Sequence, residues 1–312
     1  MNTRTLESDL YRKALHNAQK VNWNIDTDVI RFRQLDTAYK FLPDSLSLVR
    51  QLPFLNADQQ RFFSQVQGRT YAYIFGLVER YIVAEALDLS REHSLGDQDA
   101  LAAMLQFGQE EMKHQELFRR AENLAAAVMP AGYTKTADPD AVAGAVLSKS
   151  QWAILALTCH VEIFTQAHYV HSIKDGDGLS PLFKDIFRFH WMEEAQHATL
   201  DELEWQRVHD TMQPTAIDAA VTELIELVGG LDAILQTQAA ADGEYFRQNA
   251  GEFSADQRSA IDAVLLKAYR LQYIVSGVRI ERFQRALGSK VTSAQMARIQ
   301  SALAPLVTYV DD

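Results

Sequence analysis

The chain has 312 residues, 47% hydrophobic and 23% charged, which is the balance of a soluble globular protein. Its formal net charge of −11 disfavours binding to a phosphate backbone, so nucleic acid is not an expected partner. The single cysteine, Cys159, excludes an internal disulfide and a thiolate metal cage, and it indicates a reducing compartment. The N-terminus is polar and no apolar run approaches the ~20 residues of a membrane span, so we expect a cytoplasmic protein without membrane contact.

Few residues interrupt helices, because the chain holds only 14 glycines and 7 prolines. Residues 1–55 read as a lead-in with short helices. Asn56 and Ser180 are expected N-caps, and Pro181 suits a first helical turn. Four long helices are predicted at about 56–89, 98–128, 149–174 and 180–212. Further helical patterns cover 215–248, 255–287 and 293–304.

These elements predict an all-α fold, because no convincing strand pair or coiled-coil heptad is present. The four long helices are most simply a bundle, which places the core at about 56–212. We treat 1–312 as a single domain, in which 213–312 supplies additional helices that pack on the bundle.

Two Glu-x-x-His pairs stand out in the second and fourth long helices, each with a single glutamate 32 residues before it. Residues i and i+3 project from one helix face, so each pair can bind one metal site. Both pairs are preceded directly by another glutamate. A shift of 83 residues superimposes the first set on the second, taking Glu79, Glu111 and His114 to Glu162, Glu194 and His197. This reads as one helix-pair unit used twice.

Helical periodicity places all six residues on apolar faces. Four carboxylates in a core would repel one another, and two divalent cations would balance their charge. Carboxylate and imidazole ligands suit iron or manganese, and zinc also fits, so we predict a dinuclear metal site. Glu85 is a rival to Glu79, but its neighbours at helical spacing include Asp88 and Glu92, which predicts a wetter face.

A further histidine, His190, lies four residues before Glu194 on the same helix face. It is either a third imidazole ligand or a core histidine hydrogen-bonded near the site. Asp201 lies four residues after His197 and could accept the free N–H of that ring, which would orient it. The alternative for Asp201 is a solvated acid on the helix surface.

The ordered set of six residues resembles the ligand pattern of the ferritin-like di-iron oxygenases. With His190 the fourth helix reads H-x-x-x-E-x-x-H, which is similar to the p-aminobenzoate N-oxygenase group. The stretch 52–87, with FLNADQQRFF leading into YIFGLVERYIV, is also similar to that group. The resemblance covers about residues 50–210. It implies a ferritin-like four-helix bundle core with additional N- and C-terminal helices, and two iron ions, with manganese as an alternative.

The resemblance also implies an enzyme, a non-haem di-iron oxygenase that activates O2 and oxidises a small organic substrate. Known members oxidise aryl amines to nitro compounds, so N-oxygenation is the first candidate reaction. Expected partners are O2, the organic substrate and an external electron donor, and a homodimer is left open. The alternatives are another di-iron hydroxylase or oxidase, a ferritin-like ferroxidase or iron store, and a helical protein with a degenerate site. No catalytic residue beyond the metal ligands is predicted.

Overall fold

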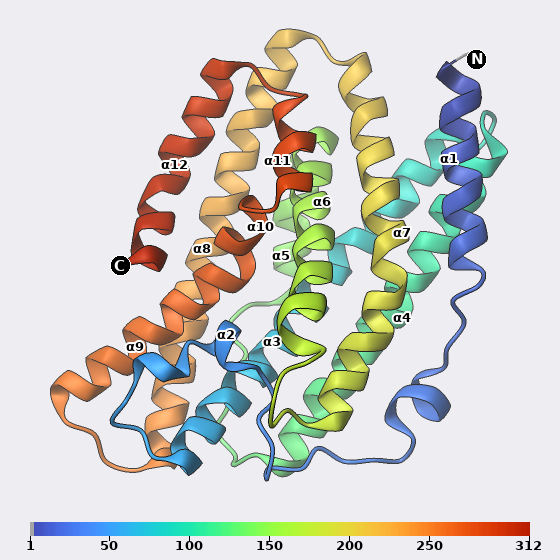
Figure 1. Ribbon diagram of the computed structural model, residues 1–312. Helices are drawn as coiled ribbons and strands as arrows, with labels where there is room; N and C mark the ends of the chain where they lie inside the picture. Colours follow the sequence, from blue (N-terminus) through green and yellow to red (C-terminus); the bar gives the residue numbers. More distant parts are fainter. Residues whose placement is uncertain (1–2) are drawn as a thin grey trace.

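The computed structural model describes residues 3–312, with side chains from Ser8 onward. This range contains α-helices, short π- and 3₁₀-helical turns and loops, and its only β pairing is an isolated bridge between Lys40 and Leu179. The predicted all-α fold is confirmed (Figure 1). No helix in the described range is long and apolar enough to cross a membrane.

The N-terminal lead-in is more regular than predicted. It begins with α1 (Thr3–Ala18), a helix of 16 residues, and continues through the π-helical turn η1 (Ile25–Ile30) and the short α2 (Asp44–Ser47). Tyr11, Ala14 and Ala18 form the buried stripe of α1, which packs against α4 and α7. The stripe is made of small and aromatic side chains, so its apolar periodicity is weak in the sequence.

The candidate ligands lie on four long helices: α3 (Ala57–Glu92), α4 (Gln98–Val128), α6 (Gln151–His168) and α7 (Pro181–Thr211). The predicted caps are confirmed, because the side chain of Asn56 accepts from the backbone of Gln59 and that of Ser180 from Phe183. α3 packs along α4, and α6 packs along α7, with α5 (Pro139–Leu147) between the two pairs in the chain. The assignment of these helices to a ferritin-like bundle stays a prediction.

The C-terminal third adds five helices: α8 (Pro214–Ala250), α9 (Ala255–Arg270), α10 (Ser276–Val278), α11 (Glu281–Gly288) and α12 (Ser293–Asp311). α8, α10 and α11 contact α6, and Figure 1 shows α8 and α12 on the side of the molecule opposite α1. The predicted continuous helix over 255–287 is wrong. A π-helical turn at Leu271–Val275 and a break near Ile280 divide it.

The apolar core consists of two clusters of buried side chains that meet along the four long helices. On α3, Phe75 belongs to one cluster and Ile82 to the other. On α7 the same division falls between Phe187 and Ala198. The candidate ligands occupy the positions between these residues, so the core is divided by a layer of polar side chains.

Gly277 allows α10 to approach α6 closely, and its replacement tests that packing. A Cβ at this position would overlap Nε2 of the buried His160, which donates to the Ile274 carbonyl at 3.1 Å. We therefore expect Gly277→Ala to lower the free energy of unfolding by about 1–3 kcal/mol, measured by urea denaturation. Gly229→Ala on α8 is the control, because its Cβ would meet nothing within 4 Å. Equal losses in the two variants would contradict this explanation.

Candidate metal centre

The structure brings all seven predicted ligands into the polar layer between the two apolar clusters. Each is at most 4% exposed, and they come from four helices: Glu79 from α3, Glu111 and His114 from α4, Glu162 from α6, and His190, Glu194 and His197 from α7. Amphipathic periodicity turned each of these positions inward, as predicted. Burial of this many ionisable groups in one place requires compensating charge.

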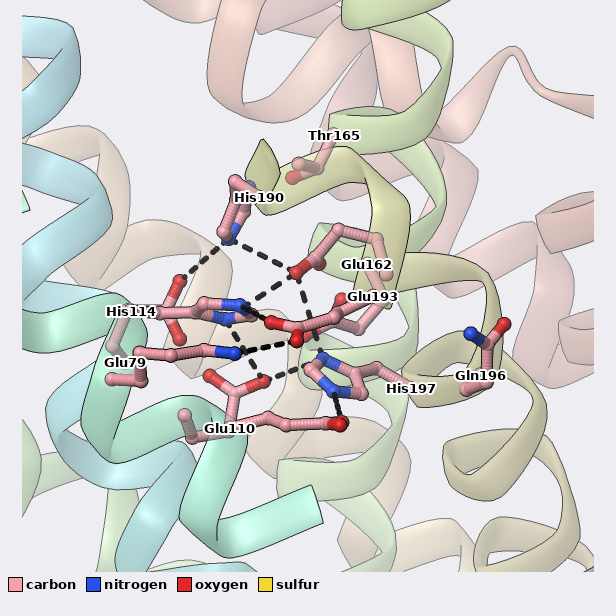
Figure 2. Close-up of polar contacts among 12 residues, drawn as sticks. Glu79, Glu110, His114, Glu162, Thr165, His190, Glu193, Gln196 and His197 are labelled. Carbon is pink, nitrogen blue, oxygen red and sulfur yellow. Dashed lines mark hydrogen bonds and ion pairs between the residues drawn. The ribbon is translucent and has the colours of Figure 1, made fainter. Parts of the chain in front are cut away.

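One carboxylate oxygen lies at the centre of the cluster. Oε1 of Glu194 is 3.0 Å from Nε2 of His190 and 3.5 Å from Nδ1 of both His114 and His197. In Figure 2 the dashed lines from these three rings meet at this oxygen. The Nδ1 atom of His197 also lies 2.6 Å from Oε1 of Glu111.

The candidate ligand atoms form two groups, each compact enough to surround one metal ion. Glu111, His114, Glu194 and His197 form the first group, and Glu79, His114 and His190 form the second. Within each group the ligand atoms lie within 4.8 Å of one another. Buried His and Glu side chains in this arrangement could hold a metal ion.

Glu162 and Glu85 belong to neither group. Glu162 lies beside Glu194, and burial raises its pKa. Glu85 is not on a wet face as predicted, because it is 5% exposed, and burial together with Asp88 and Glu92 raises its pKa to about 7. Glu79 rather than Glu85 lies at the cluster, since its Oε1 is 3.2 Å from Nε2 of His190.

Several carboxylate oxygens and ring nitrogens of the cluster have no hydrogen-bond partner among the described residues. They are Oε2 of Glu79, both oxygens of Glu111, Oε2 of Glu162, Oε1 of Glu194, and Nδ1 of His114 and of His197. An unsatisfied buried polar atom costs about 1–3 kcal/mol, and more when it is charged. Metal coordination would satisfy those atoms that belong to the two ligand groups, so the residues present fit a metal centre.

The protonation of the cluster without metal reflects the same crowding. Burial alone would raise the pKa of Glu111, but the positive charges of His197 and His114 lower it to about 2. Burial and the neighbouring Glu162 raise the pKa of Glu194 well above its usual value. Burial holds the pKa of His190 well below 6.5, and repulsion from His114 adds to this, so its ring is neutral.

The glutamates that precede each Glu-x-x-His motif orient the imidazoles of the opposite motif. Nε2 of His114 on α4 donates to Oε2 of Glu193 on α7 at 2.8 Å. Nε2 of His197 on α7 donates to Oε2 of Glu110 on α4 at 2.9 Å. These crossed bonds leave both Nδ1 atoms directed into the cluster, which is the orientation that metal ligation needs.

The expected bond from His197 to Asp201 is therefore not formed. Because Nδ1 of His197 faces the cluster, its Nε2 points across to α4 and meets Glu110 instead of a residue on its own helix. The solvated alternative for Asp201 is also wrong, since Asp201 is 1% exposed. Burial, with the nearby Glu162, raises the pKa of Asp201 well above its usual value.

Two residues that the sequence did not single out contact the cluster from outside. Nζ of Lys113 lies 2.5 Å from Oε1 of Glu193, and the same ammonium lies 3.9 Å from the ring centroid of Trp23. The Trp23 ring is nearly parallel to that of His114, at 8° and 6.1 Å between centroids. Lys113 adjoins His114 in the chain, which is the only signal for it in the sequence. Trp23 follows no motif.

Two cavities lie near the four helices. A cavity of about 610 Å³ lies against α3 and α4, and Gly76 and Phe118 are among its lining residues. The Phe118 ring contacts His190 with 4.8 Å between centroids, so one aromatic layer separates this cavity from the cluster. A cavity of about 860 Å³ lies on the far side of α6, where His160 lines it. His160 thus faces away from Glu162.

Comparisons with known proteins do not assign a family to the chain. No protein-family model matches it, and no curated protein matches it.

Proposed function

We propose that this chain is a di-iron enzyme that activates O2 and oxidises a small organic substrate, with aryl amines as the first candidates. The observation that supports it is the buried cluster of imidazole nitrogens and carboxylate oxygens, several of which have no hydrogen-bond partner among the described residues. The ligand order along the chain and the additional His190 favour the N-oxygenase-like reaction over other di-iron chemistry.

Charge balance supports two divalent cations. Four glutamates, Glu79, Glu111, Glu162 and Glu194, carry a total charge of −4 when ionised, and two Fe(II) ions would bring +4. Carboxylate oxygens and imidazole nitrogens together suit iron and manganese. Oε1 of Glu194 belongs to the group of Glu111 and His197 and also lies 3.0 Å from Nε2 of His190, so Glu194 would help to hold an ion in this cluster.

The protein's own residues would position the ions and keep the site dry. Glu110 and Glu193 hold the protons on Nε2 of His197 and His114, which leaves Nδ1 of each ring free to ligate. Phe118 and Phe107 pack against His190 and His197 and exclude water from the cluster. Bound iron supplies the redox chemistry for O2 that amino-acid side chains lack.

The cavity beside α3 and α4 is a suitable entrance for the organic substrate. Its volume of about 610 Å³ falls within the range of small-molecule sites, and Phe118 separates it from His190. Gly76 faces Phe118 across the cavity floor without a side chain, where a Cβ would lie 3.6 Å from that of Phe118.

The first prediction concerns metal content and oxygen use. Protein purified from iron-supplemented cells should hold close to two metal ions per chain, mainly iron, by elemental analysis. Glu111→Ala or Glu194→Ala should lower this content sharply, because each carboxylate lies among the ligand atoms. Glu116→Ala is the control, since Glu116 pairs with Arg119 on the outer side of α4. With a reductant, the holoprotein should consume O2 and convert aryl amines to oxidised products.

Two results would separate the alternatives. Oxidation of Fe(II) with O2 uptake but without an organic product would indicate a ferroxidase. Protein that binds neither iron nor manganese, even after anaerobic reconstitution with Fe(II), would refute the metal centre itself.

The second prediction concerns stability. A metal that binds only the folded state stabilises it by RT ln(1 + [L]/Kd), about 2.7 kcal/mol at a hundredfold excess over Kd. The metal-free protein should therefore melt at a clearly lower temperature, measured by calorimetry before and after anaerobic addition of Fe(II). Glu111→Ala should show a much smaller increase. Equal melting temperatures for verified metal-free and metal-loaded protein would contradict a site in the core.

The third prediction concerns His190. If His190 is a ligand, His190→Ala should retain most of the iron, because other protein ligands remain on each metal, but it should change the absorption spectrum of the oxidised protein. Turnover of aryl amines should fall. His171→Ala is the control, because His171 is exposed. The deciding measurement is the distance from the His190 ring nitrogen to the nearest metal in a crystal structure, where about 2.0–2.3 Å identifies a ligand. A distance beyond about 3.5 Å would make it a neighbour of the site only.

A further inference from the structure

The two crossed carboxylates have different neighbours, although their roles are otherwise equivalent. Glu193, behind His114, accepts from the ammonium of Lys113 at 2.5 Å. Glu110, behind His197, accepts from the neutral amide of Gln106 at 2.8 Å. Both glutamates are buried, at 0% and 3% exposure, whereas the side chain of Lys113 is 26% exposed, so solvent screens this difference only in part. One orienting carboxylate is therefore neutralised and the other keeps its charge.

The ammonium of Lys113 is held in place on two sides. Besides Glu193, it lies 3.9 Å over the ring of Trp23, a cation–π contact. Trp23 itself is 4% exposed and stacks on His114. The N-terminal lead-in thus fixes a positive charge directly behind the His114 side of the cluster.

A carboxylate that accepts from a ligating imidazole strengthens that imidazole as a donor. A cation that binds the carboxylate reduces this strengthening of the imidazole. A neutral amide that donates to the carboxylate reduces it less. His114 should accordingly be a weaker ligand than His197. The difference arises from a permanent positive charge close to one ring and absent from the other.

The charges of the ligands also favour metal binding at the side of His197. Glu79 is the only carboxylate in the group that contains His190, and its other members are imidazoles. The group that contains His197 holds two carboxylates, Glu111 and Glu194, and Nδ1 of His197 lies 2.6 Å from Oε1 of Glu111. The His197 side thus offers more negative charge to a divalent cation.

We propose that Lys113 makes the two metal positions unequal, so that the first ion binds at the His197 side and the second at the side of Glu79 and His190. His114 belongs to both ligand groups, and in this proposal it ligates the second ion. Lys113 is a positioning residue in this scheme, acting on the metal through Glu193 and His114. The inference rests on the proposed two-metal site. It adds an order of loading, and it assigns a role to Trp23 and Lys113, which touch no metal ligand atom directly.

The test is an anaerobic titration of the metal-free full chain with Co(II) and with Fe(II), followed by calorimetry and, for Co(II), by the visible spectrum. The wild type should show two steps of different affinity. His114→Ala should lose the weaker step and keep the stronger one, and His197→Ala should lose the stronger one. Lys113→Gln makes the surroundings of Glu193 resemble those of Glu110, so it should tighten the weaker step about tenfold and leave the stronger step unchanged.

Lys135→Gln is the matched control, because Lys135 pairs with Glu122 at 3.4 Å, away from the cluster. It should change neither step. Two equal steps in the wild type, or two unchanged steps in folded Lys113→Gln, would overturn the inference while leaving the two-metal site intact. If Lys113→Gln does not fold, the wild type and the two histidine variants still decide the order. Failure of the wild type to bind any metal would instead refute the proposed function.

Discussion

Repulsion among buried carboxylates is the constraint on which the rest of this structure depends. Four glutamates lie in one layer of an otherwise apolar core, and a core tolerates such charge only when positive charge meets it. Without metal, part of that charge comes from protonated imidazoles: burial opposes the positive charge of His197, yet Glu111 and its other acceptors raise its pKa well above the usual value. The layer lies where the two apolar clusters meet, so its electrostatics affect the packing of both.

The crossed hydrogen bonds between buried glutamates and imidazoles also connect two helices. Each long helix that carries a Glu-x-x-His motif also provides the acceptor for the imidazole on the other. α4 and α7 are therefore connected through buried charge-assisted hydrogen bonds as well as through side-chain packing. Lys113 and Trp23 extend this network to the N-terminal lead-in, because Trp23 contacts both the Lys113 ammonium and the ring of His114.

The sequence was informative wherever a residue's role depends on its own helix. Spacing within a helix sets the face on which Glu111 and His114 lie, and Asn56 and Ser180 act as caps through local bonds. The role of Asp201 could not be predicted, because the partner of His197 comes from another helix and depends on which ring nitrogen faces the cluster. Trp23 was missed for the same reason. The close approach of Gly277 to His160 is likewise a tertiary contact that no local pattern encodes.

The crossing of Glu110 and Glu193 bears on how a doubled site of this kind could arise. The two helix pairs match under a shift of 83 residues, as a duplicated segment would. One such segment alone carries a glutamate, a Glu-x-x-His motif and the preceding glutamate, but that last carboxylate is directed at the imidazole of the other segment. A single-segment ancestor would thus orient its imidazole only when two chains paired about a two-fold axis, each carboxylate accepting from the partner's ring. Fusion of two copies would then have joined what was already an intermolecular metal site.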